Sequence, residues 1–122
     1  MAKIRNDPDR EHRITMEVVV DAYDEWERAM GWYYYLDGHL KFPFKAKCIA
    51  KRITSPLTAG DEVQVVGMPP ENECACEILV TIKWQSKKLA VPLSQLVPIK
   101  AGKKTTQAVE DWRYWVKMGY EF

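Results

Sequence analysis

The spacing of apolar residues changes once along this chain, at Pro43, and this change constrains the fold more than any other feature. Before Pro43, apolar residues from Trp26 to Leu40 recur every three or four positions, which is typical of one face of an α-helix. After it, apolar and polar residues alternate, which is typical of strands with one buried face. The pattern predicts a helix followed by several short strands.

Turn residues divide the alternating part into short antiparallel strands, with a final apolar helix after them. One strand follows Pro43, one contains Val63 and Val65, and a hairpin turns at residues 85–87. The last helix carries Val109, Trp112 and either Trp115 or Val116 on its apolar face, and Gly119 follows it. The segments SPLTAGDEVQVV and ILVTIKWQSKKLAVPLSQLVPI resemble an SH3-like barrel, in which VPLSQL forms a single 3₁₀ turn. The predicted fold is mainly β: a small SH3-like antiparallel barrel with an N-terminal and a C-terminal helix packed on it.

The first twenty residues predict a tail and then a strand. Residues 1–13 are charged throughout, so we expect a flexible N-terminal tail rather than a signal peptide. Ile14 to Val20 alternate like a short strand, and residues 14–122 are expected to form one SH3-like domain. No apolar run has the roughly 20 residues of a membrane span. The odd number of cysteines without a secretory signal favours reduced thiols in the cytosol.

The aromatic run in the first helix is expected to be mainly structural. Asp21 or Asp24 is a plausible N-cap, and Gly38 stands where such a helix ends. Trp26 and Tyr33 are expected to be buried between helix and barrel, and Phe42 and Phe44 to lead into the first strand. Residues 32–35 complete a helical turn, so Tyr34 or Tyr35 must face away from that side.

Charge is segregated along the chain although the net charge is only +1. Residues 41–52 and 83–104 contain bases and no acids, whereas residues 61–77 contain acids and no bases. Such blocks arise when solvated strand faces alternate by chance. The alternative interpretation is that the acidic block, with its neighbours in space, binds a cation.

The candidate ligands of such a cation are Asp37, Glu71, Asn72 and Glu73. Calcium prefers six to eight oxygen ligands, and the chain has no EF-hand loop, so the site must combine separate segments. Asp37 is expected at a helix end, where backbone carbonyls are unsatisfied. Glu71 and Glu73 lie two apart in a Pro-bounded loop, so an extended backbone would point both side chains the same way. With few carboxylates, the dissociation constant should be on the order of 10⁻⁴ M.

Other kinds of site are less favoured. Zinc accepts three cysteines and one histidine, which here would be Cys48, Cys74, Cys76 and His39. However, the C-x-C spacing of Cys74 and Cys76 is not the usual spacing of zinc ligands. Cys48 and Cys76 are expected to be buried, reduced and metal-free. No nucleophile motif or phosphate loop is present, so we expect no enzymatic activity.

Two binding functions without a metal are alternatives. A nucleic acid would bind to basic side chains on and near the strands, namely Lys45, Lys47, Lys51, Arg52 and Lys83. The acidic block of residues 61–77 counts against this function. The second is an SH3-like interaction module that binds a protein or peptide through exposed aromatics such as Tyr34, Tyr35 and Trp84.

A more particular resemblance spans nearly the whole chain. The segments DAYDEWERAMGWYYYLDGHLKFPFKAKCI, SPLTAGDEVQVVGM, KLAVPLSQL and AVEDWRYWVKMGYEF are similar to the CcbP-type calcium-binding proteins of cyanobacteria. The resemblance implies that residues 14–122 are a single SH3-like domain of the calcium-binding type. It also implies a small cytosolic protein that binds calcium through surface carboxylates and buffers it.

Overall fold

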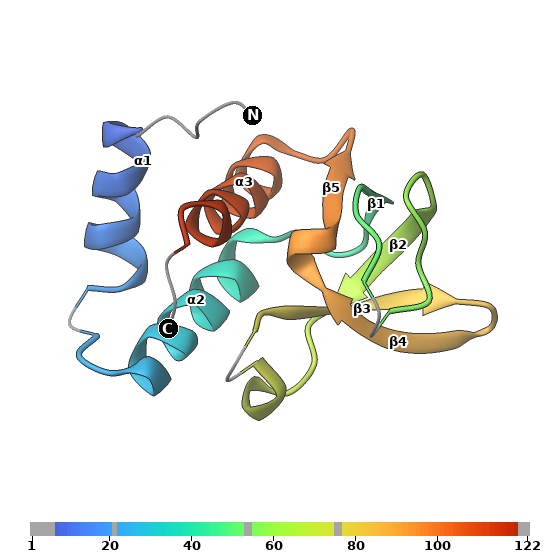
Figure 1. The fold of residues 1–122 in the computed structure, drawn as a ribbon, viewed down its shortest axis with the longest axis horizontal. Coiled ribbons are helices and arrows are strands. Elements are labelled where there is room, and N and C mark those ends of the chain that lie inside the picture. The colour runs from blue at the N-terminus through green and yellow to red at the C-terminus, as the bar shows by residue number, and fades with distance from the viewer. Residues whose placement is uncertain (1–6, 21, 53–54, 75–76, 120–122) are drawn as a thin grey trace.

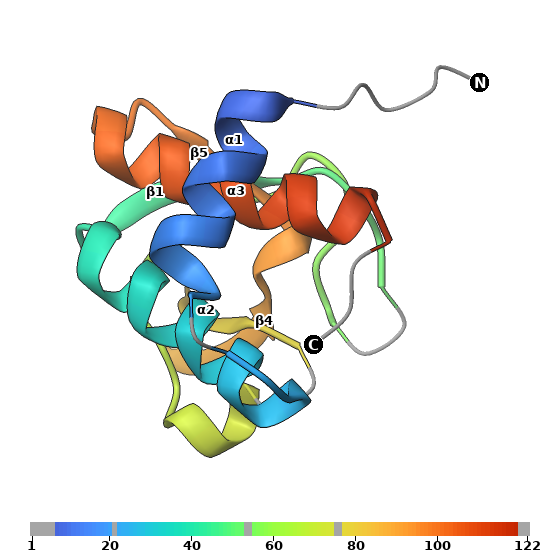
Figure 2. The same cartoon turned by 90° about the vertical axis from the view of Figure 1, so that its left-hand side faces the viewer.

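The protein places three helices on one side and a curved sheet on the other (Figure 1). The computed structural model describes residues 7–20, 22–52, 55–74 and 77–119. In the perpendicular view, α1 crosses in front of α2 and α3, so the helices form a layer of their own beside the sheet (Figure 2). The elements in chain order are α1 (Pro8–Arg13), η1 (Ile14–Val18), α2 (Glu25–His39), β1 (Phe44–Cys48), β2 (Glu62–Gly67), η2 (Glu71–Cys74), β3 (Leu79–Trp84), β4 (Lys87–Pro92), η3 (Leu93–Gln95), β5 (Leu96–Ile99) and α3 (Lys103–Lys117).

The sheet has five antiparallel strands in the order β4-β3-β2-β1-β5. Phe44, Ala46 and Cys48 of β1 are buried while Lys45 and Lys47 are exposed, which confirms the predicted alternation. The predicted 3₁₀ turn is also present, as η3. The described strands form a sheet with β4 and β5 at its edges, and no pairing closes it into a barrel there. The part of the fold prediction that the structure supports is therefore a five-stranded antiparallel sheet with helices at both ends of the chain.

The N-terminal region differs from its prediction. Residues 8–13, expected in the tail, form α1, which begins with the Asp7 side chain accepting from the Arg10 N–H at 3.1 Å. Ile14 to Val18 continue as a π-helical turn, so the strand predicted over residues 14–20 is wrong. Ile14 and Val18 are buried, and residues four apart lie on the same side of both a strand and a helix. Their spacing therefore could not decide between the two structures.

The helix α2 turns a different face to the core from the one expected. Asp24 is the N-cap, but the helix continues through Gly38 and ends at His39, with Leu40 as its C-cap. Trp26 is 48% exposed, so its predicted burial is wrong, and Tyr33 is only half-buried. Trp32 is fully buried instead, because the aromatic residues of α3 pack against it with ring centroids 5.1 and 5.5 Å away, from Trp112 and Trp115.

The helix α3 agrees with its prediction. Val109, Trp112 and Trp115 are buried against the other elements, Val116 is 40% exposed, and Gly119 follows with a positive φ of 79°. A left-handed residue after the last turn is a common helix stop, and glycine adopts it without strain. Within the described ranges, no helix combines the length and apolar character needed to cross a membrane.

Candidate functional site

The 3₁₀ turn η2 packs beside α2, and two adjacent tyrosines of α2 hold it there. The Tyr33 hydroxyl donates to the Pro69 carbonyl at 2.7 Å, just before η2 begins. The Tyr34 hydroxyl donates to the carboxylate of Glu71, the first residue of η2. The two rings contact each other edge to face with centroids 5.3 Å apart. This pair of hydrogen bonds fixes the position of Glu71 over the exposed side of α2.

Asp37 lies in the last turn of α2, four residues after Tyr33 and three after Tyr34, and so on the same side of the helix. Burial raises the pKa of Tyr33, and the negative charges of Asp37 and Glu71 raise it further. The hydrogen bond to Glu71 raises the pKa of Tyr34, with a contribution from Asp37. Both carboxylates therefore act electrostatically on the same pair of phenols.

The end of α2 also leaves a backbone oxygen without its normal helical partner. In a continuing helix the Lys41 N–H would donate to the Asp37 carbonyl. Here it donates to Thr105 Oγ1 of α3 at 3.0 Å instead. Thr105 Oγ1 in turn lies 3.5 Å from the His39 carbonyl, to which it donates. Because the Lys41 N–H is engaged with α3, the Asp37 carbonyl oxygen lacks its helical hydrogen bond. A backbone oxygen needs this freedom if it is to bind a cation.

Glu73 and Asn72 do not lie beside Glu71 in the way the sequence suggested. Residues 71–74 form a 3₁₀ helix, so the expected extended loop is wrong. Successive side chains in a 3₁₀ helix diverge by about 120°, and residues three apart eclipse. Glu71 is therefore aligned with the buried Cys74, whereas Asn72 and Glu73 are exposed and point elsewhere.

Two other acids of the 61–77 block have partners of their own. Asp61 accepts from the Thr58 N–H at 2.9 Å and so stabilises the turn before β2. Glu77 accepts two hydrogen bonds from Arg52, at 3.1 and 3.2 Å. The acidic block of the sequence is therefore not one cluster in space. Among the residues that the structure describes, no three His, Cys, Asp or Glu side chains form a group that could hold a metal ion.

The described cysteines behave as core residues. Cys48 and Cys74 are buried and free, and Cys48 Sγ donates to the Ala50 carbonyl at 3.1 Å. Burial raises the pKa of the Cys74 thiol, which keeps it protonated and disfavours metal binding. His39 directs Nδ1 at the Tyr35 carbonyl, 2.7 Å away. The prediction for Cys48 is confirmed as far as burial and the free thiol are concerned; Cys76 lies outside the described residues.

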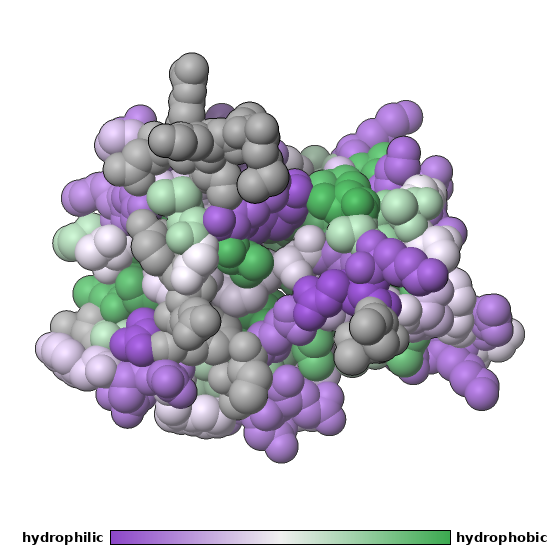
Figure 3. Space-filling model, viewed as in Figure 1, coloured by the Kyte–Doolittle hydropathy of each residue, from purple (hydrophilic) through white to green (hydrophobic). Residues whose placement is uncertain are grey.

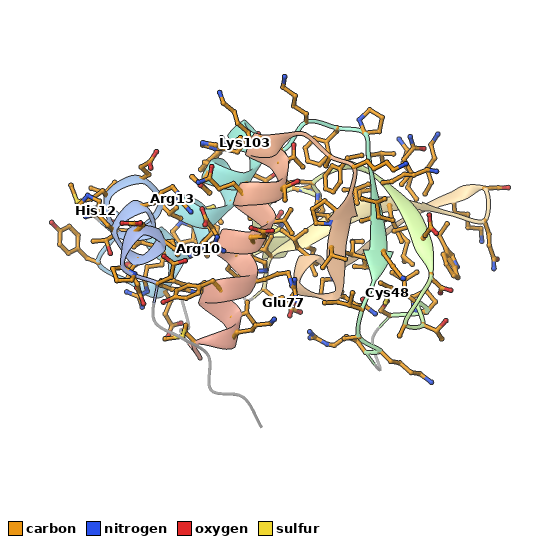
Figure 4. The ribbon with its side chains drawn as sticks, turned by 90° about the horizontal axis from the view of Figure 1, so that it is seen from above. Arg10, His12, Arg13, Cys48, Glu77 and Lys103 are labelled. Atoms are coloured by element: carbon orange, nitrogen blue, oxygen red, sulfur yellow. The ribbon has the colours of Figure 1, made fainter. Side chains whose placement is uncertain are left out.

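A buried charged cluster that the sequence did not reveal joins α1, α2 and α3. Asp111 is fully buried, and Arg13 donates to both its carboxylate oxygens at 2.9 and 2.6 Å. The Tyr35 hydroxyl donates to the same carboxylate at 2.8 Å, and Arg10 Nε lies 3.3 Å from it. Figure 4 shows Arg10 and Arg13 between α1 and α3. Because three partners already occupy Asp111, this acid is a poor candidate for a cation ligand.

The fold defines a small α+β protein, in which a five-stranded antiparallel sheet lies beside a layer of helices. The chain belongs to the CcbP family of calcium-binding proteins, whose model, described as "Calcium binding", matches residues 12–116. This is a binding-protein family and not a family of enzymes.

Two solved structures match the whole chain. The crystal structure of Anabaena CcbP is 41% identical, with a TM-score of 0.87 over 100% of both chains. A calcium binding protein in its calcium-binding form is 40% identical, again with a TM-score of 0.87 over 100% of both chains. No curated protein sequence matches the chain.

Proposed function

We propose that this protein binds calcium at the surface between the last turn of α2 and η2, and buffers the ion in the cytosol. Asp37 and Glu71 provide the first two carboxylates, and Asn72 and Glu73 supply further oxygens from the same turn. The observation that carries the proposal is the hydrogen bond from Tyr34 to Glu71, because it attaches an acid of η2 to α2 one helical turn before Asp37. Membership of a calcium-binding family supports the choice of ion.

The donor set suits a hard cation and a low affinity. Carboxylates, a backbone carbonyl and an amide oxygen are the ligands that calcium selects, and zinc would prefer sulfur or nitrogen. Asn72 and Glu73 are exposed and point away from Glu71, so binding has to reorient side chains or recruit water. Few preorganised charges imply a dissociation constant on the order of 10⁻⁴ M.

Calorimetric titration of calcium into matched variants tests the proposal. We expect Asp37→Asn and the double variant Glu71→Gln, Glu73→Gln each to weaken binding, because both changes keep side-chain size and remove charge. Glu62→Gln is the control, since Glu62 is an exposed acid on β2 whose backbone is engaged in the sheet. Equal binding by all four proteins would refute this location. Absence of heat from the wild type at millimolar calcium would refute calcium binding.

The tyrosine pair provides an independent measurement. A calcium ion at Glu71 neutralises the charge that raises the pKa of Tyr34, so that pKa should fall when calcium binds. Ultraviolet titration of phenol ionisation with and without calcium measures the change, and Tyr34→Phe should remove it. An unchanged ionisation curve in a protein that binds calcium would mean that the ion binds elsewhere.

The alternative function is an SH3-like interaction module that binds a protein without metal. The strand order and the 3₁₀ turn before β5 support an SH3-like barrel as part of either proposal. One observation favours the module: large apolar side chains are exposed between residues 16 and 26, namely Met16, Val20, Tyr23 and Trp26. Tyr35, one of the aromatics suggested for this role, is buried and hydrogen-bonded to Asp111. Binding of a partner that is unaffected by calcium, in a protein that gives no calcium heat, would favour the module.

A further inference from the structure

A pocket of about 380 Å³ lies where the end of α2, β1, β5 and the start of α3 meet. Its walls come from residues 41–45 and 99–105, which belong to the two acid-free segments of the sequence. The fold joins these segments because β1 pairs with β5, with Lys45 opposite Ile99, and because the Lys41 N–H donates to Thr105. The charge segregation seen in the sequence therefore becomes a local positive site.

Three lysines from different elements line this pocket: Lys41, Lys45 and Lys100. All three are exposed, and among the described residues that form the walls none is acidic. Each ammonium group attracts an anion in the pocket, so an anion held there is favoured more strongly than one beside an isolated lysine. Lys100 has a left-handed backbone with φ of 50°, which lets the chain turn sharply between β5 and α3.

The beginning of α3 adds donors to the same pocket. Its N-cap is Gly102, which lines the pocket and provides no side-chain hydrogen bond to the first turn. The first backbone N–H groups of a helix have no partner within the helix, and the helix dipole places positive potential there. The first turn contains Lys103 and Lys104 and no acid. Figure 4 shows Lys103 at this end of α3.

We infer that this pocket binds a small phosphate monoester, through the lysines and the free N–H groups of α3. A phosphate dianion matches several lysines and a helix N-terminus at once. The volume exceeds that of a bare phosphate, and Phe44 and Ile99 provide apolar wall for an organic group on the ester. Hydrophobic surface framed by hydrophilic side chains is visible in the β5 region of Figure 3.

The inference does not depend on calcium, so the test uses protein freed of calcium on a chelating resin. Amide resonances of the ¹⁵N-labelled chain are followed during titration with glycerol phosphate, with inorganic phosphate, and with chloride at matched ionic strength. We expect saturable shifts confined to residues 41–45 and 99–105, with glycerol phosphate binding more tightly than inorganic phosphate. Chloride should give no saturable shift. Equal effects of chloride and phosphate would reduce the site to general screening and overturn the inference.

Variants with the same change of net charge separate the pocket from the overall charge. Lys41→Gln, Lys45→Gln should weaken glycerol phosphate binding by about tenfold or more, since each ammonium beside the anion contributes attraction. Lys87→Gln, Lys88→Gln is the control, because both lysines are exposed on β4 at the opposite edge of the sheet. Equal weakening by the two pairs would overturn the inference.

A third variant distinguishes loss of binding from loss of structure. Gly102→Asp places a carboxylate where a new side chain meets open space, at a position where aspartate caps helices well. This variant should lose phosphate binding while its melting temperature stays the same or rises. Retained binding would overturn the role of the α3 N-terminus. Sedimentation with phosphatidic acid vesicles addresses the other source of the same chemistry: binding to vesicles without binding to free glycerol phosphate would overturn the assignment to a soluble ester.

Discussion

Replacing Asp111 by asparagine should destabilise the protein far more than replacing the acid next to it. Asp111 is fully buried, and its carboxylate accepts from Arg13 twice and from Tyr35 once. Asp111→Asn keeps the shape, and its amide oxygen still accepts from Tyr35, but it leaves Arg13 without its anion. Removing one partner of a buried pair costs about 3–5 kcal/mol, and the retained hydrogen bond places this variant near 3 kcal/mol.

The corresponding change in melting temperature follows from the size of the chain. Unfolding entropy is about 2.1 cal/mol/K per residue, so for 122 residues a loss of about 3 kcal/mol lowers the melting temperature by roughly 12 °C. Urea unfolding followed by circular dichroism measures the free energy, and calorimetry measures the temperature. Arg13→Gln combined with Asp111→Asn should cost less than the sum of the two single changes, because the two side chains act on each other.

Glu110→Gln is the matched control for this prediction. Its side chain is 48% exposed, and its carboxylate meets Arg10 only at 3.6 Å. An exposed pair of this kind contributes about 0–1 kcal/mol. If Asp111→Asn and Glu110→Gln lowered the free energy of unfolding equally, the buried cluster would not be what attaches α1 to α3, and the reasoning would be refuted.

Two further predictions concern packing and alkaline pH. Gly31→Ala should destabilise the protein by about 1–3 kcal/mol, because a Cβ there would overlap the Val18 carbonyl. Gly38→Ala has open space in the same helix and should stabilise the protein by roughly 0.5–1 kcal/mol. Urea unfolding measures both changes. Burial, and then the hydrogen bond to Asp111, raise the pKa of Tyr35 above its ordinary value of 10.0. Above pH 10 the unfolded chain therefore loses the Tyr35 proton more readily than the folded protein, and the free energy of unfolding should fall. Urea midpoints at neutral and alkaline pH should show a shallower fall in Tyr35→Phe; an equal fall in both proteins would contradict this assignment.

Local patterns were sufficient for the strands and for α3. The alternation from Phe44 to Cys48 and the buried pair Val63 and Val65 follow directly from one buried sheet face. Trp112 and Trp115 lie on one helical face, with Gly119 as the stop. In each of these segments the spacing of apolar residues fits only one kind of secondary structure, so the prediction does not depend on tertiary contacts.

The first helices could not be predicted as well, because two patterns fit the same residues. The spacing of Ile14 and Val18 fits both a strand and a helix. These residues are helical because α1 continues into η1. In α2, apolar residues surround much of the helix, so Trp26 and Trp32 were both candidates for the core. The face that became buried is the one on which Trp32 meets Trp112, and this contact connects α2 to α3.

The candidate site shows the same limit at the level of single side chains. The sequence supplied the acids and the helix end, and these placed Asp37 and Glu71 among the candidates. It could not show that the hydroxyls of Tyr33 and Tyr34 would hold η2 against α2, because that contact depends on the 3₁₀ turn at residues 71–74. The same turn that positions Glu71 directs Glu73 away from it. In the site that we propose, Glu73 therefore has to reorient before it can reach the ion, and this cost accounts for the weak calcium affinity that we propose.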